Sequence, residues 1–241
     1  MHYQPKLSLS KNKITCVEAL LRWQHPEFGL IMPNEFIPLC EDTGLIVDIE
    51  QQTLYLACQA LKQWQENYGI DISMSLNLSA KEFCKPDLIK SINNALQSTD
   101  ISPDRLELEI TESILLHDIN QCERKLHTLQ ELGIRLALDD FGTGYSSLKY
   151  LTHLPFDTVK IDQSFTKNML NNERACKILY AMLQLCKNLS LETVIEGVES
   201  QAQLKLLQKQ FCDYVQGYLI SPPLAESDCI QFIEKYDNSA N

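Results

Sequence analysis

The sequence predicts an α/β fold, a TIM-type (β/α)8 barrel whose first strand is antiparallel. Short apolar runs alternate with longer amphipathic segments, which is the pattern of βαβ units in a parallel sheet. Eight such runs fall within 241 residues, and a closed eight-stranded barrel needs about 250 residues. The segment between the first two runs is too short for a helical crossover, so these strands should form an antiparallel hairpin.

Each expected strand is separated from the next by turn-forming or helical sequence. The strands are expected at residues 2–9, 15–22, 71–78, 105–110, 135–138, 158–161, 193–196 and 214–219. Amphipathic stretches typical of helices lie at 48–68, 86–97, 120–132, 173–189 and 201–209. Pro33 is expected in the first turn of a further short helix, and Gly44, Gly69 and Gly133 stand where helices should end.

The composition narrows the classes of function. Hydrophobic residues make up 44% of the chain and no Gly/Ser linker divides it, so residues 1–241 should form one domain. A net charge of -11 disfavours binding to DNA or RNA polymers, and an acidic protein that acts on a phosphate ester would draw positive charge from metal ions. The sequence has no membrane-spanning run or signal peptide, and its nine cysteines are interpreted as reduced, so this portion is expected in the cytoplasm.

Polar and acidic side chains stand at the C-terminal ends of seven expected strands. These ends converge on one mouth of a barrel, where the active sites of such folds lie. Clustered carboxylates repel one another unless they are neutralised, and Mg²⁺ or Mn²⁺ binds carboxylate and amide oxygens. The residues of this ring are Glu18, Asn77, Glu109, Asp139, Lys160, Glu196 and Gln216.

The adjacent pair Asp139 and Asp140 can reach two metal ions if Asp139 bridges them. Two ions about 3.5–4 Å apart are a recurring device for in-line displacement at phosphorus. Glu112 and Glu199 lie one step beyond the ring, where a supporting hydrogen bond and direct ligation are equally good interpretations. Glu107 shares a face with Glu109 and is better explained as structural.

The same positions carry a family resemblance. Residues 18–23 read EALLRW and resemble the signature of the EAL-domain cyclic di-GMP phosphodiesterases, which open cyclic di-GMP to linear pGpG. The similarity continues in order over essentially the whole chain, through residues 2–5, 33–37, 77–79, 109–112, 139–148, 160–162, 196–199 and 216–218. The resemblance implies a hydrolase with two Mg²⁺ or Mn²⁺ ions per site, inhibited by Ca²⁺, that uses in-line attack by water.

The resemblance also implies a role for each site residue. Lys160 would orient and help activate the attacking water, with its pKa lowered by nearby cations, and Glu112 would brace the loop at residues 140–147. That loop links the second metal to the dimer interface in such domains, so a homodimer is expected. The implied metal ligands are Glu18, Asn77, Glu109, Asp139, Asp140 and Glu196, the last directly or through water. The implied substrate contacts are Arg22, Leu20, Gln216 and Asp162.

Three positions depart from the pattern of the family. Ile195 stands where a small residue is usual, Phe211 where Gly is common, and Pro222 where a basic residue is common. Tuned activity rather than loss of activity is expected from them. The chain begins almost at its first strand, so a domain excised from a longer protein is expected, with a sensor or GGDEF-type domain upstream and a full-length form that could be tethered to a membrane.

Two other functions remain open from the sequence. One is a catalytically weak receptor or interaction domain that binds cyclic di-GMP without releasing pGpG; its acids or its 140–147 loop should then be degenerate, and they are intact. The other is a metal-dependent barrel lyase or isomerase of the enolate-forming kind. Such an enzyme would not require the adjacent aspartates, and it would release no pGpG.

Overall fold

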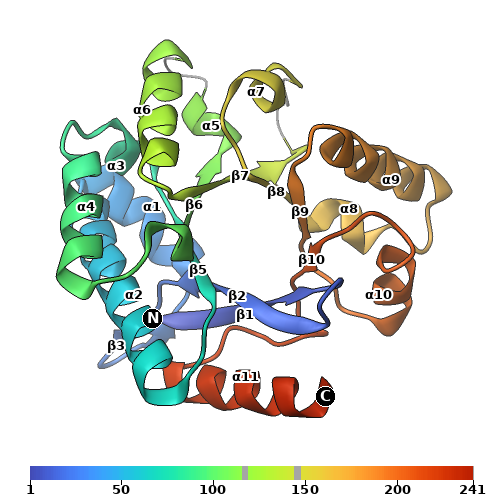
Figure 1. Cartoon of the computed structure of the whole chain (residues 1–241), viewed down its shortest axis with the longest axis horizontal. Helices are drawn as coiled ribbons and strands as arrows, with labels where there is room; N and C mark the ends of the chain where they lie inside the picture. Colours follow the sequence, from blue (N-terminus) through green and yellow to red (C-terminus); the bar gives the residue numbers. More distant parts are fainter. Residues whose placement is uncertain (116–118, 144–147, 241) are drawn as a thin grey trace.

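The strands close into a single barrel. The computed structural model describes residues 1–115, 119–143 and 148–240, and Figure 1 looks down the barrel. The strands follow one another around it in the order β1, β10, β9, β8, β7, β6, β5 and β2. Their bounds are β1 His2–Ser8, β2 Lys13–Leu20, β5 Ser73–Asn77, β6 Leu106–Thr111, β7 Arg135–Phe141, β8 Thr158–Ile161, β9 Glu192–Ile195 and β10 Tyr214–Val215.

The first strand is the irregular one, as the short first connection predicts. β1 pairs antiparallel with both β2 and β10, while the pairs from β2 to β5 and onward through β9 and β10 are parallel. Gln4 lies opposite Glu18 in the β1–β2 pair, and Ser75 lies beside Glu18 in the β2–β5 pair. The predicted fold class is therefore confirmed.

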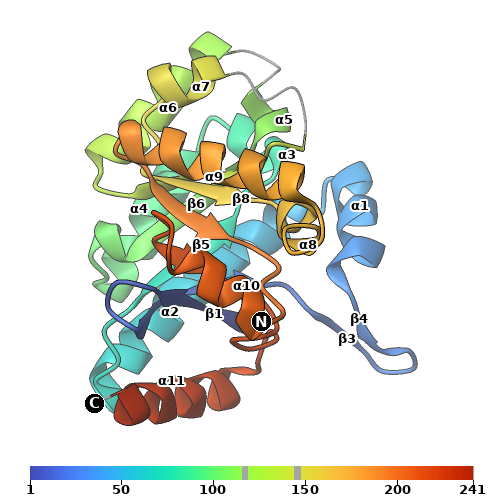
Figure 2. The same cartoon turned by 90° about the vertical axis from the view of Figure 1, so that its right-hand side faces the viewer.

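Helices cover the outside of the barrel (Figures 1 and 2). Gly44 and Gly69 end α1 and α2 in the left-handed conformation that glycine adopts without steric cost, as expected from the sequence. The helical segments are α1 Pro33–Thr43, α2 Ile46–Tyr68, α3 Ala80–Cys84, α4 Leu88–Thr99, the 3₁₀ turn η1 Pro103–Arg105, α5 Glu112–Leu115, α6 Ile119–Glu131, α7 Leu148–His153, α8 Gln163–Lys167, α9 Glu173–Asn188, α10 Gln201–Leu207 and α11 Glu226–Ala240.

Several elements were not predicted from the sequence. A two-stranded hairpin, β3 Trp23–His25 and β4 Gly29–Ile31, projects from the body between β2 and α1 (Figure 2). Helix α11 contacts β1 and β2, and the hydrogen bonds between Tyr3 and Leu224 hold the segment before it against β1. The last strand is also shorter than expected, because β10 ends at Val215 rather than at residue 219.

The two faces of the barrel wall differ in polarity. The outward faces of the strands pack with the helices in one apolar cluster that includes Val17, Leu76 and Leu108. The lumen holds buried polar and charged side chains, among them Lys6 and Lys160, which are both 1% exposed. Buried charges require partners, so the lumen of this barrel is an ion network rather than a packed apolar core. Among the helices of the described residues, none combines the length and apolar character needed to cross a bilayer.

Candidate functional site

Lys160 is the centre of the acidic ring. Its Nζ lies 2.5 Å from Glu109 Oε2, 2.9 Å from Glu196 Oε1, 3.0 Å from Asp139 Oδ1 and 3.4 Å from Glu18 Oε2. These carboxylates come from β6, the segment just after β9, β7 and β2, so the barrel brings together residues far apart in the sequence. The strand-end ring expected from the sequence therefore converges on one point.

The two amides of the ring meet at Glu18. Asn77 Nδ2 donates to Glu18 Oε1 at 2.8 Å, and Gln216 Nε2 donates to Glu18 Oε2 at 2.8 Å and to Gln4 Oε1 at 3.0 Å. Among the described residues, Gln216 Oε1 is buried with no hydrogen-bond partner. A buried amide oxygen without a partner is costly, so this atom is available to a water molecule, an ion or a substrate.

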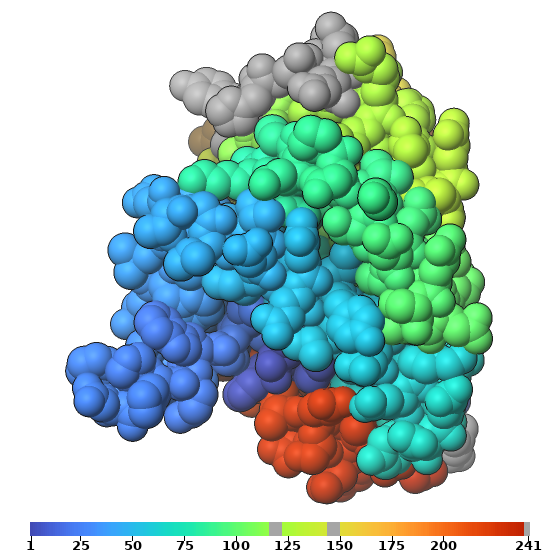
Figure 3. Space-filling model, turned by 90° about the vertical axis from the view of Figure 1, so that its left-hand side faces the viewer, coloured from blue at the N-terminus to red at the C-terminus, as the bar shows by residue number. Residues whose placement is uncertain are grey.

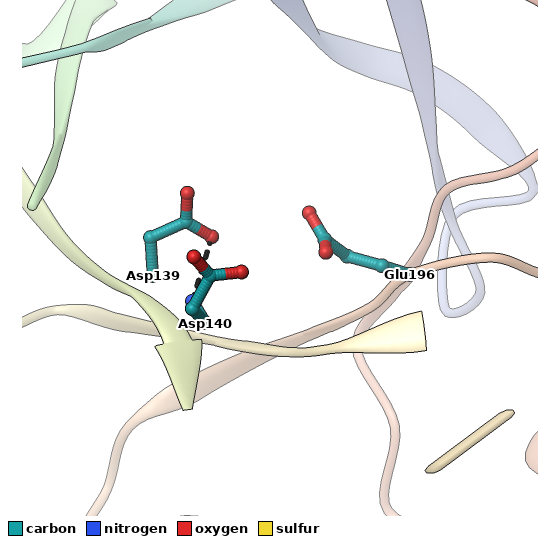
Figure 4. Close-up of side chains that lie close together, drawn as sticks. All are labelled: Asp139, Asp140 and Glu196. Atoms are coloured by element: carbon teal, nitrogen blue, oxygen red, sulfur yellow. Dashed lines mark hydrogen bonds between the residues drawn. The ribbon is translucent and has the colours of Figure 1, made fainter. Parts of the chain in front are cut away.

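Asp139, Asp140 and Glu196 present oxygen atoms to a common space (Figure 4). One carboxylate oxygen of each lies within 4.8 Å of the others. Asp140 adopts a positive φ of 55°, and its backbone N–H donates to Asp139 Oδ1 at 3.0 Å. Carboxylate and amide oxygens suit a hard divalent cation. This set of carboxylate oxygens fits such an ion.

The ring carries more negative charge than its ammonium groups balance. Burial raises the pKa of Glu18 and of Asp139, and burial raises the pKa of Glu196 to about 7. Burial alone would raise the pKa of Glu109 too, but Lys160 and Lys6 outweigh it and lower this pKa to about 2. The two lysines therefore stabilise the ionised form of Glu109, whereas Glu18, Asp139 and Glu196 remain costly to ionise. A divalent cation would lower that cost.

Lys160 is itself strongly stabilised as a cation. Burial would lower its pKa, but Asp139, Glu109, Glu18 and Glu196 together raise it well above the usual value. The expected lowering of this pKa depends on bound cations and stays a prediction. The carboxylates around Lys160 therefore favour its charged form.

Lys6 is a buried partner of the ring that sequence reasoning missed. Its Nζ lies 2.7 Å from Glu109 Oε1, 2.8 Å from Ser75 Oγ and 3.4 Å from Glu107 Oε1. Glu107 also accepts from the Thr158 hydroxyl at 2.8 Å and pairs with Arg135 Nε at 3.6 Å. The alternation of Gln4, Lys6 and Ser8 along β1 was the available signal that a polar face points into the lumen.

The residues expected to contact substrate do not all line the same cavity. Leu20 ends β2 and, with Glu18, Glu196 and Gln216, lines a cavity of about 400 Å³ at the mouth. Arg22 lies beyond the end of β2 rather than within that strand, and its guanidinium donates to the carbonyl of Leu21 at 2.7 Å. Asp162 caps α8 by accepting from the backbone N–H of Ser164 at 2.9 Å.

Glu112, the first residue of α5, contacts the start of the glycine-rich loop. The Gly142 N–H donates to Glu112 Oε1 at 3.2 Å, so the two segments are in contact. Glu199 is positioned by Gln203, which accepts from its backbone N–H at 2.9 Å. The loop at residues 140–147 was expected to contact a second subunit, and residues 144–147 lie outside the described part of the chain.

The three departures from the family pattern lie away from the acidic ring. Ile195 is fully buried in the apolar cluster behind β9. Phe211 is 51% exposed, with the Lys187 ammonium over its ring. Pro222 is exposed beyond the mouth. None of these side chains is among the contacts of Lys160.

Comparison with known proteins gives consistent results. The chain is 40% identical over 224 residues to the bifunctional diguanylate cyclase/cyclic di-GMP phosphodiesterase MucR of Pseudomonas aeruginosa, covering 93% of this chain and 33% of MucR. It is 38% identical to the cyclic di-GMP phosphodiesterase NbdA of the same species, covering 98% of this chain and 30% of NbdA. The chain thus spans about a third of the length of these curated relatives.

A solved structure and a family description agree with those relatives. The c-di-GMP complex of the PaMucR phosphodiesterase superposes with a TM-score of 0.90 at 39% identity, covering 95% of this chain and 92% of that one. The description of the EAL domain matches residues 1–223. The chain therefore belongs to the EAL domain family.

Proposed function

We propose that this chain is a Mg²⁺- or Mn²⁺-dependent phosphodiesterase that hydrolyses cyclic di-GMP to linear pGpG. The observation that carries the proposal is the convergence of Glu18, Glu109, Asp139 and Glu196 on Lys160, beside the Asp139–Asp140 pair. The names of the relatives MucR and NbdA, and the c-di-GMP complex of the PaMucR phosphodiesterase, support the choice of substrate.

Two ions would bind in this proposal. Glu18, Glu109 and the amide oxygen of Asn77 would hold the first, Asp140 and Glu196 the second, and Asp139 both. The ions would polarise the phosphodiester and make the attacking water a better nucleophile. The excess of carboxylates over the ammonium groups of the ring supports this assignment, because uncompensated buried charge is unfavourable.

The protein residues would position the water and the substrate. Lys160 would donate a hydrogen bond to the attacking water and stabilise negative charge that develops near it. Gln216 Oε1 would accept a hydrogen bond from that water or from the substrate. Arg22 would turn from the Leu21 carbonyl to a phosphate oxygen, where a guanidinium can bind with two parallel hydrogen bonds. Leu20 and Asp162 would contact the nucleotide.

The wider assignments are part of the same proposal. Glu112 would brace the 140–147 loop, and this loop would form the interface of a homodimer. Since the chain spans about a third of its curated relatives, it would act as one domain of a longer protein, with a sensor or GGDEF-type domain upstream. This domain would work in the cytoplasm.

The direct test is hydrolysis of cyclic di-GMP by the purified chain, with products separated by chromatography. We expect pGpG with Mg²⁺ or Mn²⁺ and inhibition by added Ca²⁺. Asp140→Asn should remove most of the activity, while Asp48→Asn, which alters an exposed carboxylate on α2, should retain it. Binding of cyclic di-GMP without product in either metal would contradict the proposal and indicate a receptor.

A further inference from the structure

A second cavity lies on the side of the barrel, between the strands and helices α1 to α4. Its volume is about 410 Å³, within the range of small-molecule sites. Figure 3 shows the face on which α1 and α2, in blue, meet α3 and α4, in blue-green. Leu54, Leu76, Leu88 and Ile92 supply much of its apolar lining.

Three carboxylates also line this cavity, and no basic side chain is among its described lining residues. They are Glu41, Glu50 and Glu82. Glu50 accepts from the Ser79 backbone N–H at 3.0 Å and from its hydroxyl at 2.8 Å, so its oxygen atoms are engaged. The cavity therefore combines an apolar wall with acidic groups of one sign.

The carboxylate of Glu82, unlike that of Glu50, is poorly hydrogen-bonded. It is 2% exposed, and its Oε1 has only a long hydrogen bond of 3.5 Å from Gln51 Nε2. Within the part of the chain that the structure describes, its Oε2 is buried and has no hydrogen-bond partner. A buried carboxylate oxygen without a partner is strongly unfavourable.

The basic residues near Glu82 are engaged elsewhere. Lys125 Nζ donates to the backbone carbonyls of Phe83 and Lys85, and Lys85 is exposed. Burial raises the pKa of Glu82, and Lys85 and Lys125 only partly oppose that effect. The local residues thus leave a demand for positive charge or hydrogen-bond donors inside the cavity.

We propose that this cavity is a binding site for a small organic cation with an apolar body, whose ammonium group pairs with Glu82. The apolar part of the ligand would pack against the leucines, and the ammonium would donate to Glu82 Oε2. The cavity shares a wall with the acidic ring, because Asn77 at the end of β5 lines it. The proposal stands on the contacts of Glu82 and does not depend on the proposed phosphodiesterase chemistry.

The test is isothermal titration calorimetry of the whole chain with three probes of similar shape and different charge. These are phenethylamine, phenethyl alcohol and hydrocinnamate, and cyclic di-GMP is left out. We expect phenethylamine to bind about tenfold or more tightly than the alcohol, because charge-assisted hydrogen bonds are stronger than neutral ones, and hydrocinnamate to bind most weakly. Equal affinity for amine and alcohol, or binding of neither, would overturn the proposal.

Variants locate the binding and separate charge from shape. Glu82→Gln should weaken the amine about tenfold and leave the alcohol unchanged, whereas Glu66→Gln, on the exposed side of α2, should change neither. Ala80→Phe should narrow the cavity and weaken both probes, which decides the matter if Glu82→Gln does not fold. Unchanged amine affinity in Glu82→Gln, or in Ala80→Phe, would show that the amine binds elsewhere.

Discussion

Lys160 offsets part of the negative charge of the ring in the absence of metal, so its removal should increase the repulsion among the acids. The side chain is 1% exposed and contacts four carboxylates. Removing one partner of a buried ion pair typically costs about 3–5 kcal/mol. We expect Lys160→Met to lower the free energy of unfolding by this order in EDTA, and Mg²⁺ to recover part of the loss, as measured by urea denaturation.

Lys62→Met is the matched control for that change. Lys62 also pairs with two acids, Glu66 and Asp100, but this pairing is on the surface. Its removal should change the unfolding free energy little in either condition. An unchanged unfolding free energy for Lys160→Met in EDTA would contradict this, because it would mean that repulsion among the four carboxylates does not lower the stability of the fold.

Asp139 is the residue on which both proposed ions depend. Asp139→Asn keeps the shape of the side chain and removes one negative charge, so the fold should persist. We expect the rate of cyclic di-GMP hydrolysis to fall roughly a hundredfold or more, measured at saturating Mn²⁺ with circular dichroism as the check on folding. Near wild-type hydrolysis by this variant would rule out the two-ion assignment.

The sequence predicted the residues of the ring but not all of its contacts. Glu18, Asn77, Glu109 and Asp139 could be identified because each lies at or near the end of its strand, where strand polarity fixes the side-chain direction. The role of Lys6 could not be read in this way, since it lies within β1 and not at a strand end, and the alternation along β1 indicates a polar face but not the partner of each side chain. Its burial follows only from barrel closure, which brings β1 across the lumen from β6.

The segment between β9 and α10, just after Glu196, requires a glycine at residue 197 for reasons of space and backbone geometry. Gly197 has a φ of +66°, and a Cβ at this position would lie 2.4 Å from Cβ of Gln163. We expect Gly197→Ala to lower the unfolding free energy by about 1–3 kcal/mol from backbone strain alone, with more from the clash. Because Glu196 would shift with it, hydrolysis of cyclic di-GMP should fall as well.

Gly44→Ala separates these two causes. Gly44 has a similar φ of +81°, but nothing lies within 4 Å of its added Cβ. The control should therefore carry the backbone strain without the clash and without the loss of hydrolysis. Thermal denaturation measures the loss of stability in both variants. Equal losses would show that the contact with Gln163 is relieved at no cost in free energy.

The junction of α2 with α3 should make stability depend on pH. Burial raises the pKa of Glu50 from 4.5 to about 7, so the folded state holds a proton that the unfolded state releases between these values. The contribution of Glu50 is therefore full below pH 4.5 and is lost as the pH rises to about 7, by up to about 3 kcal/mol.

A comparison of unfolding free energies at pH 5 and pH 8, in EDTA, measures this effect. Glu50→Gln should reduce the difference between the unfolding free energies at pH 5 and pH 8. Asp48→Asn, exposed on the same helix, should leave this difference as in the wild type. The pKa of Glu196 is also raised to about 7. Glu196 is present in the wild type and in both variants, so its contribution cancels when their pH dependences are compared. An identical pH dependence in the Glu50 variant would contradict the assignment.

Periodicity predicted most of the elements, and short length explains why β3 and β4 were missed. The strands at β5 to β9 and the ends of α1 and α2 lie close to their expected positions because alternation and terminal glycines are local signals. The three-residue strands β3 and β4 are too short to show a period. The two-residue strand β10 is set by its pairing with β1 and β9, which no local pattern specifies.

At the scale of the whole molecule, metal binding should act on global stability. The proposed ligands come from β2, β5, β6, β7 and the segment after β9, so an ion in the ring would connect most of the barrel wall. A ligand that binds only the folded state stabilises it by about 2.7 kcal/mol at a hundred times its dissociation constant. We expect Mn²⁺ to raise the unfolding free energy by this order, and Asp140→Asn to reduce the gain.

Hydrogen exchange can show where that stabilisation acts. If the ions connect strands far apart in the sequence, then Mn²⁺ should slow exchange through global unfolding, in β2 and β5 through β9 together. If the ions bound only to a local cluster such as Asp139 and Asp140, then protection would be confined to the end of β7. The second result would contradict the ring as one site, because a ring that spans the barrel cannot be formed while part of its wall is open.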